Sequence, residues 1–232
     1  MTVAAILLAL VSTAPAGVID ANNVPVNVGV SSEDLLFAVV SAVGSGSDVT
    51  FHSKTIGSYT GFGIGGGYSD AEVDLNGEKL TVEYDNPTVI TELILAFLYP
   101  NQGWDDVVNE VARVTVVTPA SLVGELTALT SSTATWSGAP SLVTNLDPAV
   151  NPNAGVWKIS MPFGSQLVQK IEFTSVAVAG GPDSALNSDF GIVSITNSDS
   201  EVPEASSVLL TGLGLVLLGG SSRKWRSRPS DR

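Results

Sequence analysis

The chain has 232 residues, of which 44% are apolar, 14% are charged and none is Cys. This length and apolar fraction suit one domain with a buried core and a further segment at each end. The lack of Cys excludes disulfides, Cys-ligated zinc and thiol catalysis, and a single histidine, His52, makes a His-rich metal site or a His-dependent triad hard to build.

The formal charge of −13 is unevenly distributed along the chain. Five of the ten basic residues fall within positions 223–232, so residues 17–200 hold 5 basic and 20 acidic side chains, a net charge of −15. A surface of this sign repels nucleic acid, and we expect no nucleic-acid partner. The excess acid either keeps the domain soluble or attracts divalent cations.

The N-terminus carries an apolar run of nine residues, Val3–Val11. A membrane-spanning helix needs about 20 residues, but a run of this length is typical of the hydrophobic region of a signal peptide. Ala14 and Ala16 supply a small-x-small cleavage site, so residues 1–16 are predicted to be a signal peptide cut after Ala16. No Lys or Arg precedes the run, and a buried first strand or helix is the alternative.

Strand patterns separated by turn-forming clusters fill residues 17–200. Lys79–Tyr84 and Arg113–Thr118 alternate apolar and polar side chains, and clusters such as Gly44–Asp48 and Asp85–Pro87 favour turns. The predicted strands are 35–40, 49–52, 79–84, 88–98, 112–118, 156–161, 167–179 and 190–196, with 121–130 as a helix or apolar loop. The pattern predicts an all-β fold, an antiparallel β-sandwich that is jelly-roll-like.

The run Gly61–Gly67 is rich in glycine but lacks the setting of a phosphate-binding loop. No Lys-Ser or Lys-Thr follows it, and no βαβ unit surrounds it. The glycines are expected to let a strand or loop pass closely packed backbone.

Asp70, Glu72 and Asp74 alternate along the chain, so a strand would place all three side chains on one face. Their repulsion would be relieved by a hard cation, and Ca²⁺ takes carboxylate, amide and carbonyl oxygens, which Asn76 and the backbone could add. The full EF-hand pattern is absent. We therefore consider a Ca²⁺ site at these three residues, with a solvated acidic face as the alternative and no other cofactor.

Other residues suggest carbohydrate chemistry. Two further acidic groups, at 105–110 and at 183–189, could supply the carboxylate pair of a glycosidase, but no Gly-x-Ser-x-Gly elbow occurs in residues 17–200. Exposed aromatic side chains could stack on sugars, and the candidates are Tyr99, Trp104 and Trp136, whereas Trp157 is expected in the core. An enzyme is the lesser hypothesis here.

The C-terminal region has three parts in a fixed order. Residues 202–205 hold a Pro-Glu motif, 206–222 an uncharged span rich in Gly and Leu, and 223–232 a basic tail. Counted from Ala205, the span gives a helix of roughly 27 Å, enough to cross the hydrocarbon of a membrane. The basic tail predicts a cytoplasmic C-terminus.

This order resembles the PEP-CTERM sorting signal of Gram-negative bacteria that produce exopolysaccharide. The resemblance covers residues 202–228, and it departs from the usual family pattern at Ala205, where Pro is common. It implies recognition by an exosortase, a membrane enzyme that cuts near the Pro-Glu motif and transfers the protein outward. The resemblance implies that the signal residues are Val202, Pro203, Glu204, Arg223, Lys224 and Arg226. A plain single-pass anchor is the alternative, and both place residues 17–200 outside the cell.

A looser similarity lies within residues 17–200. A glycine-rich stretch, Gly61–Ile64, precedes the acidic segment Asp70–Asp74 and the strand-like Gly77–Val82, with Leu95–Tyr99 and Asn109–Ala112 beyond them. This arrangement is similar to a sandwich domain among PEP-CTERM cargo proteins, and Ser188–Ile192 resembles the last strand of many jelly-roll domains.

Together these features predict an exported, non-enzymatic surface or matrix protein. Residues 1–16 would be its signal peptide, 17–200 its cargo domain and 201–232 its sorting signal. The expected partners are an exosortase, the membrane and exopolysaccharide. A glycan-binding module that depends on Ca²⁺ and a carbohydrate-active enzyme are the alternatives.

Overall fold

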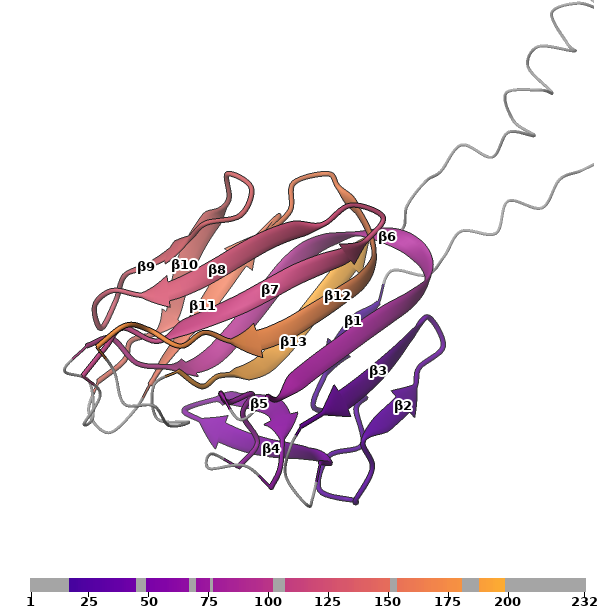
Figure 1. The fold of residues 1–232 in the computed structure, drawn as a ribbon, viewed down its shortest axis with the longest axis horizontal. Helices are drawn as coiled ribbons and strands as arrows, with labels where there is room; N and C mark the ends of the chain where they lie inside the picture. The colour runs from indigo at the N-terminus through magenta and orange to yellow at the C-terminus, as the bar shows by residue number, and fades with distance from the viewer. Residues whose placement is uncertain are drawn as a thin grey trace, which may run out of the picture. The chain divides into compact units, whose positions relative to one another are not determined.

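The computed structural model describes residues 17–44, 49–66, 70–75, 77–101, 107–150, 154–180 and 188–198. Every regular element among them is a β-strand, which confirms the all-β prediction (Figure 1). The strands are β1 Val18–Asp20, β2 Ser32–Asp34, β3 Ala38–Val43, β4 Phe51–Ile56, β5 Tyr59–Ile64, β6 Lys79–Leu98, β7 Val111–Thr118, β8 Leu122–Ala128, β9 Ala134–Trp136, β10 Leu142–Asp147, β11 Gly155–Ser160, β12 Leu167–Ser175 and β13 Gly191–Ser198.

All pairings are antiparallel, and four of the twelve strand pairs include β6, a strand of 20 residues. Along one edge, β6 pairs with β12 and then with β11; along the other, it pairs with β3 and then with β13. Its first part therefore belongs to the layer β2-β3-β6-β12-β7-β8-β9, and its last part to a second layer with β13, β11 and β10. The result is a β-sandwich-like fold in which one strand belongs to both layers.

The bend that lets β6 change layers lies at Asp85–Thr88. Lys170 of β12 pairs with Glu83 of β6, yet Val168 already pairs with Thr88, so several residues of β6 bulge out of the ladder. Pro87 has no N–H to donate and is tolerated at such a bulge. A turn between two separate strands was predicted at Asp85–Pro87. That prediction was wrong, because these residues bend one continuous strand. Figure 1 shows this arch at the right of the molecule.

The first and last described residues lie beside this bend. Val18 of β1 pairs with Thr196 of β13, and Gly17 exchanges hydrogen bonds with Asn197, donating to its Oδ1 at 3.1 Å and accepting from its N–H at 3.0 Å. The Asn197 amide donates to the Thr88 hydroxyl at 3.1 Å. We call this side of the domain, with Gly17, Asp85–Thr88 and Ser198, the arch end.

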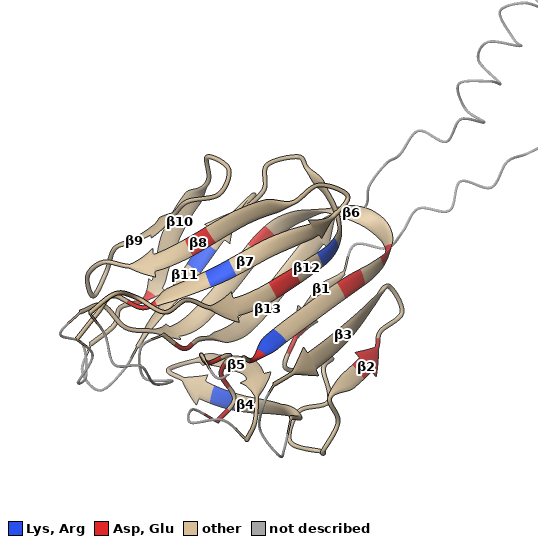
Figure 2. Ribbon diagram, in the orientation of Figure 1, with Lys and Arg blue, Asp and Glu red and all other residues tan. Residues whose placement is uncertain are grey.

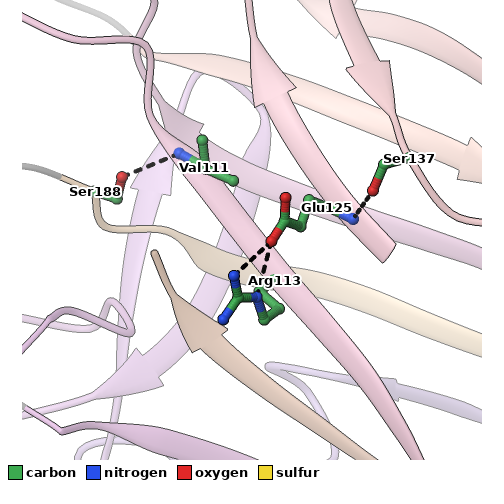
Figure 3. A network of polar contacts seen from close by, with 5 residues as sticks. All are labelled: Val111, Arg113, Glu125, Ser137 and Ser188. Carbon is green, nitrogen blue, oxygen red and sulfur yellow. Dashed lines mark hydrogen bonds and ion pairs between the residues drawn. The ribbon is translucent and has the colours of Figure 1, made fainter. Parts of the chain in front are cut away.

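The opposite side gathers the connections 65–78, 99–110 and 176–190. Ser198 pairs with Val89 and Gly191 with Ala96, so seven residues of β6 separate the two sides, roughly 23 Å of strand. Phe190 next to Gly191 bridges to Val73, and the Ser188 hydroxyl accepts from the Val111 N–H at 3.1 Å (Figure 3). We call this side the acidic end, because six described carboxylates lie in these connections: Asp70, Glu72, Asp74, Glu78, Glu110 and Asp189.

Alternation along the strands explains the core. In β6, Leu80, Val82 and Tyr84 are buried while Glu83 between them is exposed. After the bend, the buried side chains change from even-numbered positions, such as Ile90, to odd-numbered ones, Leu93 and Leu95. The change falls where the pairing of β6 with β13 shifts register. Trp157 is fully buried, as predicted.

Residues 121–130 were expected to be a helix or an apolar loop, and that prediction was wrong. Leu122–Ala128 is strand β8, because it pairs with β7 on one side and with β9 on the other. Arg113 of β7 fixes the pair by donating twice to Glu125 of β8, at 2.9 and 2.7 Å, and the Glu125 N–H donates to the Ser137 hydroxyl (Figure 3).

The glycine run behaves as predicted where the structure describes it. A Cβ on Gly63 of β5 would stand 2.5 Å from the carbonyl oxygen of Ala71, and one on Gly61 would stand 2.9 Å from the Phe97 ring. The absence of side chains therefore lets segment 70–75 and Phe97 pack directly on β5.

We predict that Gly63→Ala lowers the free energy of unfolding by about 2–3 kcal/mol, because the added methyl meets backbone atoms that cannot move aside. Chemical denaturation of the two proteins measures the difference. Gly44→Ala is the matched control, since its Cβ would meet the Glu78 side chain at 3.1 Å and needs only a small adjustment. Equal losses for the two variants would show that close backbone packing at β5 is not what requires glycine.

Candidate functional site

The acidic end is the candidate site, because it holds the carboxylates singled out in the sequence. Its central segment, 70–75, is not a regular strand: it makes only single bridges, Glu72 with Ile64 and Val73 with Phe190. Ala71 has a φ of 69°, which breaks the alternation. The expected single face of three exposed carboxylates was therefore wrong, since Asp70 is exposed while Glu72 and Asp74 are buried.

Glu72 is held by a lysine from the neighbouring strand. Lys54 of β4 donates to Glu72 Oε1 at 2.9 Å, and the Glu72 side chain is 3% exposed. The same ammonium lies 5.1 Å from the centre of the Phe97 ring, an arrangement that favours a cation. A carboxylate this deeply buried needs such a partner, because desolvation of an unpaired charge costs several kcal/mol.

Phe97 is itself unusual, with a φ of 67°, a conformation rare for a bulky residue. Its ring covers Gly61 of β5 and Gly191 of β13, where a Cβ would stand 2.9 and 2.6 Å from the ring. The two glycines and the strained backbone together place the ring under the Lys54 ammonium.

Asp70 interacts with the single histidine of the chain. Its Oδ1 lies 2.7 Å from Nδ1 of His52, and the Asp70 side chain is 72% exposed. The imidazole ring covers Gly65, where an added Cβ would stand 2.4 Å from the ring. Asp70 and Glu72 therefore each face a basic side chain of β4.

Asp74 and Glu78 form a pair of buried acidic residues. The Asp74 N–H donates to Glu78 Oε2 at 3.1 Å, and the two residues are 1% and 4% exposed. Burial raises the pKa of Glu78 to about 7, and the Asp74 carboxylate adds to the rise, while the hydrogen bond from the Asp74 backbone opposes it. Glu78 thus titrates near neutral pH.

The other two acidic groups are described only in part. Glu110 is buried, accepts from the Tyr99 N–H through Oε2 and donates its own N–H to the Tyr99 carbonyl at 3.0 Å, so it ties β6 to β7. Asp189 is 7% exposed. Trp104, Asp105, Asp106 and Asp183 lie outside the described residues.

The described residues contain no group of three or more His, Asp or Glu side chains arranged to hold a metal ion. Asp70 and Glu72 lie against His52 and Lys54, so the charge compensation expected from a cation comes in part from side chains. Ca²⁺ binding at Asp70, Glu72 and Asp74 stays a prediction.

All five basic residues of the domain form ion pairs with acidic residues. Besides Lys54, these are Lys79 with Glu172 at 3.0 Å, Arg113 with Glu125 at 2.7 Å, Lys158 with Glu92 at 3.4 Å and Lys170 with Glu83 at 3.4 Å. Figure 2 shows these opposite charges side by side on the strands. The net negative charge is therefore carried by the other acidic residues.

Of the two described tryptophans, Trp157 is fully buried and Trp136 is half-buried. Trp136 donates its Nε1–H to the Pro162 carbonyl at 2.9 Å and makes an edge-to-face contact with Phe163. Gly124 and Gly138 lie against the same indole, where a Cβ would stand 2.0 and 2.4 Å away. Trp136 and Tyr99, two of the candidates for stacking on sugars, are both half-buried, and sugar binding at either stays a prediction.

A small hollow lies at the arch end. Its lining residues are Leu36, Phe37, Tyr84, Asp85, Asn86, Thr88 and Asn197. The Tyr84 hydroxyl is buried, and in the described part of the chain it has no hydrogen-bond partner. Burial raises the pKa of Tyr84, so the phenol stays neutral.

The predicted processing residues lie outside the described residues. They are Ala14, Ala16, Val202, Pro203, Glu204, Arg223, Lys224 and Arg226. Within the residues that the structure describes, no helix is long and apolar enough to cross a membrane.

Sequence reasoning missed Glu78 and Lys54. Glu78 continues the even spacing of residues 70, 72 and 74, so the pattern gave a signal for it. Lys54 gave none, because its contact with Glu72 depends on how segment 70–75 lies on the β4–β5 hairpin.

No protein-family model, no curated protein and no solved structure matches the chain.

We predict that Glu78→Gln changes the pH dependence of stability. In the wild type, unfolding lets Glu78 ionise above pH 4.5 while the folded form stays protonated up to about pH 7, so stability falls as pH rises between these values. The shift corresponds to a loss of about 3 kcal/mol. Gln does not ionise and so removes this loss. The free energy of unfolding of the variant should therefore rise relative to that of the wild type between pH 4 and pH 8.

Denaturant titrations at the two pH values measure this change. The pH 4 comparison is the internal control, because Glu78 is then mostly protonated in both states and the substitution should cost little. A difference between variant and wild type that stays constant from pH 4 to pH 8 would contradict the raised pKa.

Proposed function

We propose that this chain is an exported surface or matrix protein without enzymatic activity, sorted by signals at its two ends. Residues 1–16 act as a signal peptide, and residues 201–232 act as a PEP-CTERM-like signal that an exosortase recognises. The apolar segment 206–222 anchors the precursor in the membrane before processing. The domain 17–200, a jelly-roll-like sandwich, then faces outward, where exopolysaccharide is the expected surrounding.

The observation that carries this proposal is the pairing of the first and last strands. β1 pairs with β13, and Gly17 pairs with Asn197, so the domain closes on itself between the two predicted signals. Both cuts would then fall outside the hydrogen-bonded sheet and leave the core untouched. A cargo domain that loses both ends during export needs this arrangement.

The charge of the domain supports the same proposal. After the five Lys and Arg side chains are paired, 15 of the 20 acidic residues in 17–200 remain and give the domain a strong negative charge. Such a surface keeps a protein soluble and apart from its own copies. That property suits a component secreted into a polysaccharide matrix.

We predict that the exported protein begins at Gly17. Mass spectrometry of the surface fraction should find Gly17 as its first residue, because Ala14 and Ala16 fit the small-residue pockets of signal peptidase. Ala16→Tyr should block the cut and leave the precursor uncleaved, while Thr13→Tyr, outside the two small positions, should be cut normally. An exported wild-type protein that retains Met1 would refute the signal peptide.

We predict that replacing Pro203 and Glu204 by Ala leaves the protein anchored and uncut in a host that encodes an exosortase. The basic tail resists translocation, because insertion of Arg or Lys into the membrane centre costs about 2.5–3.5 kcal/mol each. Deletion of Arg223–Arg232 should instead let the segment slip and release unprocessed protein. Immunoblots of membrane and medium fractions distinguish these results.

Glu201→Gln is the matched control for this experiment, since it changes a neighbouring acid outside the Pro-Glu motif. It should be processed like the wild type. If the Pro203 and Glu204 variant is processed normally as well, residues 201–232 are a plain anchor and the sorting proposal fails.

A further inference from the structure

Gly17, the first described residue, is buried, and both of its backbone polar groups are hydrogen-bonded. Its N–H donates to Asn197 Oδ1 at 3.1 Å, and its carbonyl oxygen accepts from the Asn197 N–H at 3.0 Å. The Phe37 ring covers the residue, since a Cβ on Gly17 would stand 2.4 Å from the ring. Any other residue at position 17 would therefore have to displace that ring.

The side chain that accepts from the Gly17 N–H is itself held in place. Asn197 is 4% exposed, and its amide nitrogen donates to the Thr88 hydroxyl at 3.1 Å. These contacts fix the orientation of the amide and direct Oδ1 at the Gly17 nitrogen. A fixed oxygen acceptor binds a charged donor more strongly than a neutral one.

The hollow at the arch end adjoins Gly17. Phe37 and Asn197, which both contact Gly17, are among its lining residues, and its volume is about 40 Å³. Tyr84 also lines it, and burial raises the pKa of the Tyr84 phenol, which stays neutral. A space of this size suits a group as small as an ammonium or a water molecule rather than a whole sugar ring.

The charge around the hollow is negative. Asp85, at the β6 bend, is exposed and is the only charged residue among those that line the hollow. Glu83 of the same strand is paired with Lys170 of β12. Strand β13 and the connection between β2 and β3 have no charged residue. Strands β1 and β2 add acidic residues only, namely Asp20, Glu33 and Asp34.

The proposed cut after Ala16 would create a cation at this point. It converts the amide nitrogen of Gly17 into a primary α-amine, which is protonated below a pKa of about 7.7–8.0 in an unfolded chain. The ammonium keeps a proton to donate to Asn197 Oδ1, and its charge strengthens that bond. The Phe37 ring and the Asp85 carboxylate both favour a positive charge nearby.

We infer that the arch end is a binding site for a primary ammonium group, and that its ligand is the α-amine of Gly17 in the mature protein. Asn197 Oδ1, the Phe37 ring and the Asp85 carboxylate form the site. The inference rests on the proposed cut after Ala16. Removal of the signal peptide then stabilises the folded domain in addition to completing export.

Two forms of the protein in the same detergent isolate the effect of this amine. The precursor, residues 1–232, and the mature chain, residues 17–232, share every ionisable side chain, because residues 1–16 contain none. Urea denaturation of both forms is followed by circular dichroism at about pH 6.5 and at about pH 9.5, on either side of the ordinary pKa of an α-amine. The change in their difference with pH reports only on the position of the α-amine.

The mature chain should unfold at a higher urea concentration than the precursor at about pH 6.5. Binding raises the pKa of the amine in the folded state above its unfolded value, so the advantage is complete below about pH 7.7 and is lost as pH rises through the folded pKa. An advantage that does not change with pH, or a precursor at least as stable at about pH 6.5, would overturn the inference. Failure of the cut is read separately, because the exported protein would then retain Met1.

Asp85→Asn and Asn197→Ala test whether the effect belongs to this site. In each variant the mature and precursor forms are compared with each other, so a general loss of stability cancels. Both substitutions should reduce the pH-dependent advantage about twofold or more. Asp20→Asn, on β1 but outside the hollow, is the matched control and should leave it unchanged. An advantage that both arch-end variants retain in full would also overturn the site.

Discussion

The fold depends on the antiparallel pairing of β6 with four other strands. β12 and β11 follow one another along one edge of β6, and β3 and β13 along the other, so both layers are built on a single strand. A flat strand of 20 residues could not serve two layers. The bulge at Asp85–Thr88 turns it, and Pro87 suits that place because it needs no donor there. The first and last strands meet beside the bend, since Asn197 of β13 bonds to both Thr88 and Gly17.

Local alternation predicted several of the strands in which one face is buried. Lys79–Tyr84 and Arg113–Thr118 are strands, and the predicted core position of Trp157 is confirmed. Alternation could not show that Asp85–Pro87 bends a strand instead of ending it, because that depends on partners on both sides. Likewise β8 has an ambiguous apolar pattern and becomes a strand through its pairing with β7 and β9. The alternation of Asp70, Glu72 and Asp74 misled for the same reason: Ala71 has a positive φ, and tertiary contacts bury two of the three.

The scarcity of basic residues governs the electrostatics of the domain. All five are paired, and four of them join neighbouring strands in partly exposed pairs that contribute little each. Lys54 differs, because its partner Glu72 is almost fully buried and the Phe97 ring lies close to its ammonium. Glu78 has its pKa raised by burial and by Asp74, so it avoids an uncompensated charge by staying protonated up to about pH 7. Two buried carboxyl groups at the acidic end are thus stabilised in different ways: Glu72 pairs with the Lys54 ammonium, and Glu78 keeps its proton.

The β6 arch has a consequence for the way in which this domain can be joined to segments on either side of it. Because β1 and β13 close the sheet beside the bend, segments that extend beyond Gly17 and Ser198 start from one side of the domain. The connections with the acidic residues lie seven strand residues away along β6. Neither the strand order nor the composition alone places Gly17 beside Asn197; that follows from the pairing of β1 with β13 next to the bend of β6.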